Sequence, residues 1–392
     1  MRIAVLTSSY PRFPGDGAAP FVQSLARALA RQGHAVAVVA PYDAAVRPLP
    51  PEPNLVVHRF RYVWPARLHI MGHARALEND ERLRPLALLL LPQFLLMAAL
   101  CLLRTVRRWR AEVIHAHWVL PNGAAAAAVS LLTGVPYVVS LHGSDIYLAR
   151  RFRPFGAVAG WVLRRAQAVT ACSDELREAA LALGARTVRL LPWGADPELF
   201  APRPRRDGPP VVAALGRLVS KKGFDILLEA WPSVAAEVPA ARLRIGGDGP
   251  LRPLLARQAV AGVELLGPLR WDEVPRFLAE ADIFVLPSRR NSKGNVDGLP
   301  TVLLEAMSCG AAVVASDIGG VGLVVRHEQT GLLTPPGDPA ALAAALRALL
   351  ADPERRAAFS AAARRAVEER LNWDAVAAEF ARLFDAARRS DR

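Results

Sequence analysis

Two carboxylates flank the start of one predicted helix in the second half of the chain. The run from Asp297 to Gly310 reads DGLPTVLLEAMSCG. Pro300 is typical of the first turn of a helix and Gly310 of its exit, so Asp297 lies in the preceding loop and Glu305 on the second turn. Free amides and a positive dipole end favour a diphosphate there, and a deeper carboxylate can accept hydrogen bonds from a sugar diol. The alternative is an ordinary N-terminal acid followed by a surface glutamate.

Lysine is rare in this chain, and two of its lysines are adjacent. It occurs only at Lys221, Lys222 and Lys293, whereas arginine supplies every other basic residue. The enrichment in Arg, Ala, Pro and Gly is typical of a GC-rich coding bias, so the lysine pair stands out as a candidate site. The alternative for Lys221 is that it is a solvated neighbour of a functional Lys222.

A second group of polar residues follows apolar runs in the first half. Residues 113–118 read VIHAHW and residues 141–145 read LHGSD, so His142 comes directly after a predicted strand. Ligands bind at the carboxyl ends of parallel strands, and we therefore expect a functional role for His142. A satisfied structural histidine is the alternative. Of the two earlier histidines, His115 and His117, we expect one to pack beneath the site.

Short apolar runs alternate with helical stretches, which predicts α/β domains built on doubly wound parallel sheets. The first series of predicted strands is Ile3–Leu6, Ala35–Ala40, Leu55–Phe60, Val113–His115, Tyr137–Leu141, Ala168–Ala171 and Val188–Leu191. The second series is Val211–Leu215, Leu243–Ile245, Val263–Leu266, Ile283–Leu286 and Ala312–Ala315. Between them, residues 201–210 contain four prolines and fit neither a helix nor a central strand. We predict domains at 1–200 and 211–372, a linker at 201–210, and a final helix in 373–392 that packs back on the first domain.

Composition narrows the possible partners. A length of 392 residues with 52% hydrophobic residues is enough for two domains with buried cores. The net charge of +13 favours nucleic acid, an anionic membrane surface or a phosphate-bearing small molecule. Three widely spaced cysteines provide no disulfide framework or metal knuckle, which indicates a reducing compartment. The apolar run at the amino end is too short for a signal peptide.

One segment complicates a purely soluble interpretation. Residues 86–103 carry no charge and are flanked by Arg84 and Arg104. A spanning helix needs about 20 such residues, and Pro92 and Gln93 interrupt this stretch. We expect a buried helix, or one that its arginine-rich flanks hold against a membrane surface, rather than a true span.

The order of these motifs resembles glycosyltransferase family 4 over nearly the whole chain. Residues 297–305 resemble the E-x7-E signature of that family, and LGRLVSKKGFD at 215–225 is similar to its G-R-L-x-x-x-K-G-x-D stretch. IGGDGP at 245–250 looks like its nucleotide-side turn. The runs LGP at 266–268, VLPS at 285–288, GG at 319–320 and TGLL at 330–333 follow in family order, and VIHAHW and LHGSD agree with the amino half.

This resemblance implies a GT-B fold, in which two Rossmann-like domains face a cleft. The first domain is expected to hold mainly the acceptor and the second a nucleoside-diphosphate sugar. The implied activity is retaining transfer of a hexose-type sugar to a hydroxyl acceptor, with no metal and no cofactor. In agreement, the sequence contains no Asp-x-Asp motif that could hold a divalent cation against a diphosphate.

The resemblance also assigns roles to individual residues. Arg217 and Lys222 match the pair that binds the donor phosphates, and Glu305 matches the acid that holds the nucleotide ribose. The other residues expected beside the donor are Gly15, Gly17, Gly216, Gly247, Asp248, Gly298, Leu299, Pro300 and Thr301. The residues expected on the acceptor side are His117, His142 and Asp145. The set implied in catalysis is His142, Arg217, Lys222 and Asp297, and no residue is expected to bind a metal.

Two positions depart from the family pattern. The first acid of the signature is Asp297, which is shorter than glutamate by one methylene group. Gly322 and Leu323 stand where many members carry Pro-Glu. Because Arg217, Lys222 and Glu305 are retained, we expect an active enzyme with an altered sugar preference.

Other functions remain possible from the sequence alone. A sugar-nucleotide 2-epimerase shares the two-domain architecture, and the two departures also fit a non-catalytic sugar-nucleotide binder. A nucleic-acid partner is not expected, because no groove-reading motif appears. The arginine-rich, apolar first half favours a lipid-linked acceptor or a growing polysaccharide or glycolipid. We therefore expect a cytoplasmic protein that can bind peripherally to the cytoplasmic face of the membrane. The sequence specifies neither the sugar nor the base.

Overall fold

The computed structural model describes residues 1–392 apart from 74, 79–81, 205–207 and 390–392. The described chain forms two compact units, one of residues 1–191 with the last helix and one of residues 192–372. The predicted first domain, 1–200, therefore ends too late. Residues 192–200 belong to the second unit, where Ala195 N–H donates to the Leu371 carbonyl at 2.9 Å. Part of the predicted linker at 201–210 lies outside the described residues.

The first unit is built on a seven-stranded parallel sheet in the order β3-β2-β1-β6-β7-β8-β9. Its strands are continuous apolar runs because both faces of the sheet are covered. They are β1 (Arg2–Leu6), β2 (Ala35–Pro41), β3 (Leu55–Phe60), β6 (Val113–His117), β7 (Tyr137–Leu141), β8 (Ala168–Ala171) and β9 (Val188–Leu190). The predicted strands agree with these within two residues at each end. Two short antiparallel strands, β4 (Leu77–Glu78) and β5 (Arg82–Leu83), were not predicted.

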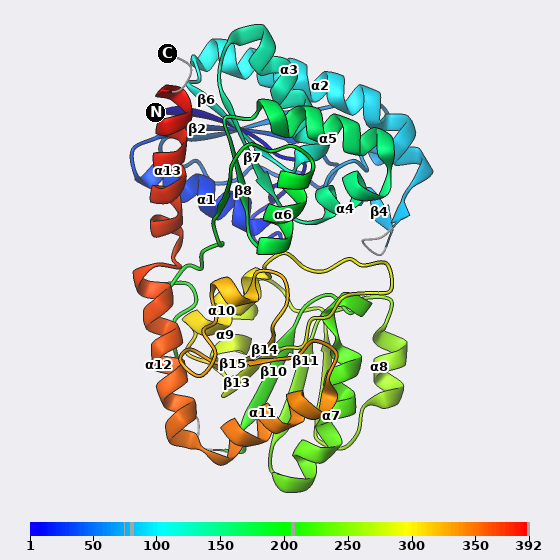
Figure 1. Ribbon diagram of the computed structural model, residues 1–392, viewed down its shortest axis with the longest axis vertical. Helices are drawn as coiled ribbons and strands as arrows, with labels where there is room; N and C mark the ends of the chain where they lie inside the picture. The colour runs from blue at the N-terminus through cyan, green and yellow to red at the C-terminus, as the bar shows by residue number, and fades with distance from the viewer. Residues whose placement is uncertain (74, 79–81, 205–207, 390–392) are drawn as a thin grey trace. The chain divides into compact units, whose positions relative to one another are not determined.

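Helices cover both faces of this sheet (Figure 1). One face carries α1 (Pro20–Arg31) and α13 (Trp373–Arg389), which pack against each other. The other face carries α2 (Pro85–Trp109), α3 (Ala124–Thr133) and α5 (Arg153–Arg165). The remaining helices of the unit are α4 (Ser144–Arg151) and α6 (Asp174–Ala182).

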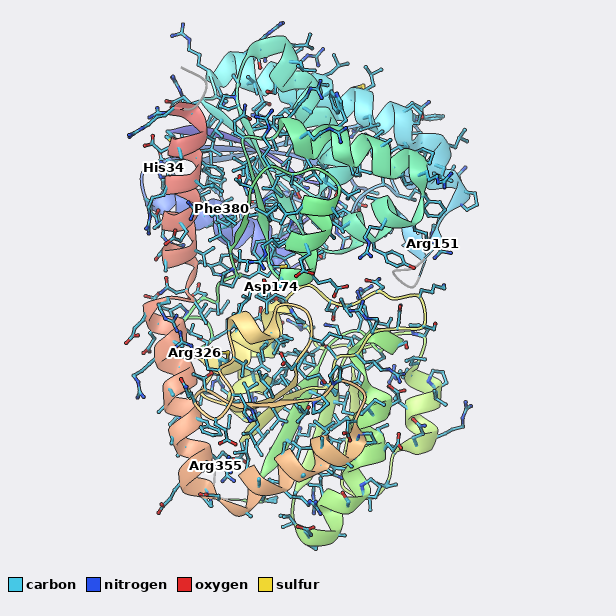
Figure 2. The ribbon with its side chains drawn as sticks, in the orientation of Figure 1. His34, Arg151, Asp174, Arg326, Arg355 and Phe380 are labelled. Carbon is cyan, nitrogen blue, oxygen red and sulfur yellow. The ribbon has the colours of Figure 1, made fainter. Side chains whose placement is uncertain are left out.

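The last helix of the chain belongs to the first unit. Phe380 lies on the side of α13 that faces the sheet (Figure 2). Phe380 and Phe384 are fully buried, and each ring lies 5.1 Å from the ring of His115 on β6. At the helix start, Asp374 forms a 2.8 Å ion pair with Arg31 of α1. The chain therefore returns to its first sheet after completing the second.

The second unit has a six-stranded parallel sheet in the order β12-β11-β10-β13-β14-β15. Its strands are β10 (Val211–Leu215), β11 (Arg242–Gly246), β12 (Val263–Gly267), β13 (Ile283–Leu286), β14 (Ala312–Ser316) and β15 (Leu332–Thr334). Five of the six were predicted, and the three-residue β15 was missed. The first strand of this sheet in sequence, β10, lies in its middle, and the later strands are added on both sides of it. Loops on either side of this point therefore meet at its carboxyl edge.

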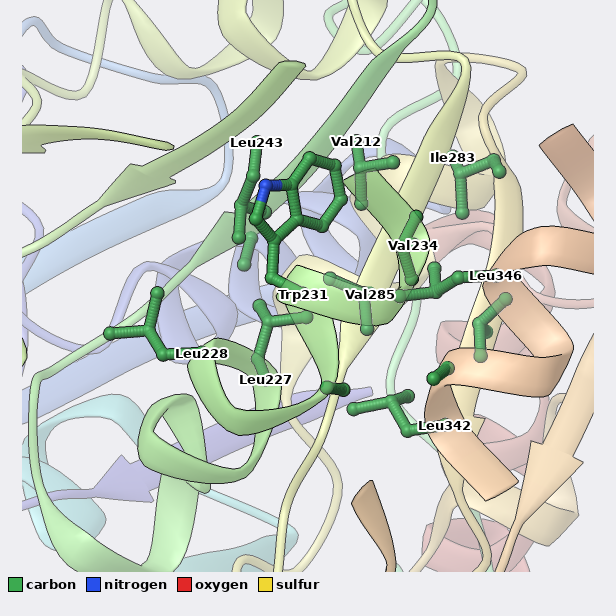
Figure 3. Packing of buried hydrophobic residues seen from close by; sticks show 14 of the residues in the cluster. Val212, Leu227, Leu228, Trp231, Val234, Leu243, Ile283, Val285, Leu342 and Leu346 are labelled. Carbon is green, nitrogen blue, oxygen red and sulfur yellow. The ribbon is translucent and has the colours of Figure 1, made fainter. Parts of the chain in front are cut away.

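Helices α7 (Phe224–Glu237) and α11 (Pro339–Ala351) pack together against this sheet, whereas α9 (Val274–Ala279) and α12 (Pro353–Glu369) pack with α10 (Thr301–Ser308). The short helix α8 (Arg252–Gln258) adjoins α7. The core beneath α7 and α11 is organised around Trp231, which is fully buried among aliphatic side chains (Figure 3). This packing holds the start of α7, and the turn that precedes it, against the sheet.

The uncharged run predicted at 86–103 lies within α2. Among the described residues, α2 is the one helix that is long and apolar enough to cross a membrane. It continues through Pro92 without a break. One side of it is part of the core, with Phe94, Ala98 and Leu102 fully buried.

Candidate active site

The candidate site with the most charged residues in contact lies at the start of α10, where the loop after β13 ends. The helix begins at Thr301, so Pro300 is the residue that precedes it, and Gly310 follows its end with a φ of 79°. Leu299 is buried and anchors the loop. Asp297 lies in that loop and Glu305 on the second helical turn, as the sequence predicts. Glu305 is only 6% exposed.

Asp297 is held by both lysines of the adjacent pair. Its Oδ1 lies 2.9 Å from Nζ of Lys221 and its Oδ2 lies 2.7 Å from Nζ of Lys222. Both lysine side chains are 12% exposed. The alternative that Lys221 is a solvated neighbour is therefore wrong, because its ammonium group contacts the same carboxylate as that of Lys222. Three charged groups thus converge in front of α10.

The turn that carries the lysines is braced by the next strand. Residues Ser220–Lys222 form a 3₁₀ turn after β10, and β13 is the neighbouring strand in the sheet. The backbone N–H of Arg289 donates to the Lys221 carbonyl at 2.9 Å, and its guanidinium binds the Ser220 carbonyl and the Asp225 carboxylate. Gly223, with a φ of 67°, passes so close to the Pro287 carbonyl that a Cβ would lie 1.8 Å from it.

Arg289 was missed in the sequence. The available signal was its place just after a strand that neighbours the lysine-bearing loop in a doubly wound sheet. It acts here as a positioning residue, because it contacts the backbone of the lysine turn.

A third loop joins this region through backbone contacts alone. Gly247 follows β11 with a φ of 131°, and a Cβ there would lie 1.8 Å from the Gly216 carbonyl. The Leu218 N–H donates to the Asp248 carbonyl at 2.9 Å. The Asp248 side chain is exposed and lies 3.8 Å from Arg252. Glycine at 247 therefore lets the loops after β10 and β11 meet. Arg217, whose side chain is exposed, follows Gly216 in the first of these loops.

The Gly319-Gly320 pair packs on the backbone of the Asp297 loop. The Gly320 N–H donates to the Gly298 carbonyl at 2.5 Å. Gly319 has a φ of 64°, and a Cβ on it would lie 2.3 Å from the Asp297 carbonyl. A carboxylate also lies near the departure at Gly322, because Oδ1 of Asp317 is 3.5 Å from the place where its Cβ would be. Close backbone packing thus fixes the loop that presents Asp297.

The two acids of this site have opposite electrostatic environments. Burial raises the pKa of Asp297, but the ammonium groups of Lys222 and Lys221 outweigh that effect and hold its pKa below the ordinary value. Burial raises the pKa of Glu305 to about 7, against a small opposing contribution from the Thr301 hydroxyl. Asp297 is therefore a fixed anion, and Glu305 titrates near neutrality.

The predicted acceptor-side residues gather at the carboxyl edge of the first sheet. His142 follows β7, and its Nε2 lies 3.1 Å from Nδ1 of His117 at the end of β6. The Trp118 ring stacks on the His142 ring at 4.2 Å. Burial lowers the pKa of His117 to about 3, and burial and the neighbouring His117 lower that of His142. Both rings are therefore neutral at pH 7.

Asp145 organises these loops rather than lining a surface. It is 2% exposed, and its carboxylate accepts hydrogen bonds from the N–H groups of Val119 at 2.8 Å and Gly143 at 3.1 Å. His115 is the histidine that packs beneath, with its Nε2 2.7 Å from Oγ of Ser140. Trp118 was missed in the sequence, although it directly follows His117 in the VIHAHW run.

The loop after β1 carries the two remaining predicted donor residues. Gly15 has a φ of 81°, and a Cβ on either Gly15 or Gly17 would meet no atom within 4 Å. Asp16 lies between the two glycines, and its carboxylate accepts a forked pair of hydrogen bonds from Arg12 at 2.7 and 2.9 Å. Gly15 and Gly17 are therefore in a defined turn with open space around them.

Among the described residues, no group of three or more His, Cys, Asp or Glu side chains is placed to hold a metal ion.

Comparisons with known proteins match both halves of the chain. Residues 15–199 match the family described as Glycosyltransferase Family 4, and residues 209–352 match that described as Glycosyl transferases group 1.

Individual sequence relatives and solved structures are also similar to this chain. A glycogen synthase of Mycobacterium tuberculosis is 30% identical over 412 aligned residues, covering 100% of this chain and 96% of that protein. A GDP-mannose-dependent alpha-(1-6)-phosphatidylinositol monomannoside mannosyltransferase of the same species is 38% identical over 256 residues, covering 59% of this chain and 66% of that protein. A sucrose-phosphate synthase structure from Thermosynechococcus elongatus superposes with a TM-score of 0.77 at 21% identity, with 98% of each chain covered. At this identity, the structural similarity shows the GT-B fold alone.

Proposed function

Because the chain belongs to glycosyltransferase family 4 and is a glycosyltransferase, we propose that it transfers a hexose-type sugar from a nucleoside diphosphate to a hydroxyl acceptor, with retention and without a metal. The observation that supports this proposal most strongly is the convergence of Lys221, Lys222 and Asp297 in front of α10. These cations lie where a helix start also favours a diphosphate.

The proposed step is a front-face displacement. An acceptor hydroxyl oxygen bonds to the anomeric carbon as the bond from that carbon to the diphosphate breaks. The electron pair of the broken bond goes to the phosphate oxygen, which also takes the hydroxyl proton. Lys222 and Arg217 stabilise the negative charge that grows on the diphosphate, which is electrostatic catalysis.

The remaining site residues position the two substrates. Glu305 accepts hydrogen bonds from the nucleotide ribose hydroxyls, and Asp297 is placed for a hydroxyl of the transferred sugar. His142 is neutral and can accept or donate a hydrogen bond on the acceptor side. Trp118 and His117 hold its ring in one orientation.

The proposed acceptor is lipid-linked and reaches the protein at the cytoplasmic face of a membrane. Two observations support this part. A relative is named for a phosphatidylinositol mannoside substrate, and α2 presents a long apolar surface with arginines at its end. The nucleotide base and the sugar are to be identified by experiment.

A donor panel tests the proposal. Saturating UDP-, GDP- and ADP-sugars are compared by thermal shift, because a ligand that binds the native state raises its apparent stability. The donor identified in this way is then used to measure transfer. We expect Lys222→Ala to lower the transfer rate about 100-fold or more and Glu305→Ala to weaken donor binding about tenfold or more.

Lys293→Ala is the matched control, because Lys293 is the remaining lysine of the chain and is exposed. If Lys222→Ala and Glu305→Ala both transfer sugar as fast as the wild type, the assigned site is wrong. Incubation with donor alone, followed by sugar analysis, would reveal an epimerase.

A further inference from the structure

The outer side of α2 is apolar over most of its length. Leu86, Leu89, Leu96 and Leu100 are 38%, 73%, 59% and 37% exposed. At about 100° per residue, these four side chains fall on one narrow side of the helix, opposite Phe94 and its buried neighbours. We call these four residues the α2 leucine face. Only 28% of the most apolar window of α2 is buried, although its mean hydropathy is 2.5.

The charges on α2 itself have one sign. Helix α2 contains no acidic residue, and Arg104 and Arg107 continue the same side of the helix for two further turns. Arg84 precedes the helix, and Arg108 and Arg110 follow on its last turn. This pattern complements a negative surface, because arginine heads reach phosphate groups while their stems stay on apolar surface.

The loop that contacts the buried side of α2 carries an exposed tryptophan. Trp64 is 87% exposed, which is unusual for so large an apolar ring. It lies in the loop after β3, where the ring of Tyr62 is 5.2 Å from the ring of Phe94 in the middle of α2. Tryptophan is enriched at membrane–water interfaces, where its ring spans the boundary between headgroups and acyl chains.

We propose that the α2 leucine face docks the protein on the surface of an anionic lipid bilayer. The inference rests on the proposed function, since it names the surface that brings the site to a lipid-linked acceptor. Helix α2 lies in the interface plane, with its leucines among the upper acyl chains and its arginines at the headgroups.

Two other uses of this helix fit the structure less well. A transmembrane span would pull Phe94, Ala98 and Leu102, all fully buried, out of the core of the first unit. A second copy of the chain would bring arginines against arginines, with no acidic residue on α2 to pair with them. An anionic bilayer supplies the missing negative charge.

Vesicle flotation tests this proposal with the full chain. Vesicles of phosphatidylcholine alone are compared with vesicles that contain 30% phosphatidylglycerol, at about 0.1 M salt, where the Debye length is about 10 Å. We expect the wild type to float with the anionic vesicles and to release at about 1 M salt. The double variant Leu89→Gln, Leu96→Gln should partition at least tenfold more weakly, because two exposed leucines leave the lipid phase.

The matched control is Leu181→Gln, Leu254→Gln, which alters two exposed leucines on α6 and α8. It should float like the wild type. Wild-type protein that floats with neither vesicle, or a Leu89/Leu96 variant that floats as well as the wild type, overturns the proposal. So does a wild-type dimer that the variant converts to monomer without lipid, since the face would then bind a second copy.

Donor binding separates this proposal from the proposed function. The Leu89/Leu96 variant should melt within a few degrees of the wild type and keep its thermal shift with the sugar nucleotide. If vesicle binding fails while sugar transfer persists, only the docking surface is wrong. If vesicle binding holds while no sugar nucleotide binds, the proposed activity is wrong and the surface stands.

Discussion

At the scale of single residues, the candidate site is an ion cluster of Asp297, Lys221 and Lys222 that a bound diphosphate would have to rearrange. The Asp297 carboxylate lies between the ammonium groups of Lys221 and Lys222, so it neutralises part of the charge that would attract phosphate oxygens. A bound donor would compete with Asp297 for these lysines. Released from them, Asp297 could turn to a hydroxyl of the sugar. One residue would thus weaken diphosphate binding and yet assist transfer.

Asp297→Asn separates these two effects. We expect nucleoside diphosphate to bind several-fold more tightly, because the two ammonium groups lose their carboxylate, whereas sugar transfer falls at least tenfold. Titration calorimetry with the nucleoside diphosphate and initial transfer rates measure the two quantities. Asp272→Asn removes the same charge from an exposed pair with Arg270 and is the control. Weaker diphosphate binding by Asp297→Asn would contradict the competition.

Glu305 makes stability depend on pH. Burial raises its pKa from 4.5 to about 7 in the folded protein, so the carboxyl is easier to ionise after unfolding. Its contribution to stability is intact below about pH 4.5 and is lost as pH rises through 7, by about 3 kcal/mol in total. Glu305→Gln cannot ionise. We therefore expect the Tm of Glu305→Gln minus that of the wild type to increase between pH 5 and pH 8.

The same carboxyl couples donor binding to protons. Ribose hydroxyls donate to an ionised carboxylate, so binding lowers the pKa of Glu305 and releases a proton near pH 7. Calorimetry in buffers of different ionisation enthalpy measures that release, which should vanish in Glu305→Gln. For the stability prediction, an equal Tm difference between Glu305→Gln and the wild type at pH 5 and pH 8 would show that Glu305 is ionised in both the folded and the unfolded protein.

At the scale of elements, the site is held by loops that touch through their backbones. The turn after β10, the loop after β11 and the Gly319-Gly320 loop each approach a neighbour more closely than a Cβ would allow. This packing explains why glycines are placed at 223, 247 and 319. A methyl group at one of these glycines should therefore displace the neighbouring loop and the charged side chain that this loop carries.

Gly319→Ala tests this coupling. The new methyl group would lie 2.3 Å from the Asp297 carbonyl, so we expect the loop to shift and nucleotide affinity to fall at least tenfold. Gly337→Ala is the matched control, because Gly337 also has a positive φ but has nothing within 4 Å of its Cβ position. Both variants should lose about 1–2 kcal/mol of stability from backbone strain, measured by thermal melts. Equal nucleotide affinity in the two variants would contradict the coupling.

The sequence predicted most elements of both sheets, because buried parallel strands are continuous apolar runs bounded by polar loops. It missed β15, whose three residues carry too short a pattern. The motif spacing predicted Asp297, Lys222 and Glu305 in one unit. It did not reveal that Lys221 reaches the same carboxylate, because adjacent residues of a 3₁₀ turn leave the axis about 120° apart and are not expected to converge. Arg289 was missed, and the buried position of Asp145 was not expected. Both residues contact the backbone of a loop that follows a neighbouring strand, and such contacts leave no pattern in the sequence.

At the scale of the whole molecule, the chain builds two cores and closes the first with its last helix. The second core is contained within residues 192–372 and is centred on Trp231. The first requires α13, whose Phe380 and Phe384 are buried against β6. The two ends of the sequence therefore stabilise one unit, while the candidate donor residues at Lys222, Asp297 and Glu305 lie in the other.

Phe384→Ala should reveal this division. Removing a fully buried phenylalanine costs about 3–5 kcal/mol, and we expect that loss in the unit that contains β1–β9. Differential scanning calorimetry, with and without saturating nucleoside diphosphate, measures it. The nucleotide should raise the transition of residues 192–372 equally in wild type and variant, because its proposed contacts lie there. Trp231→Phe, a change in the other core, should lower the nucleotide-sensitive transition instead. A nucleotide shift that disappears in Phe384→Ala would contradict this division.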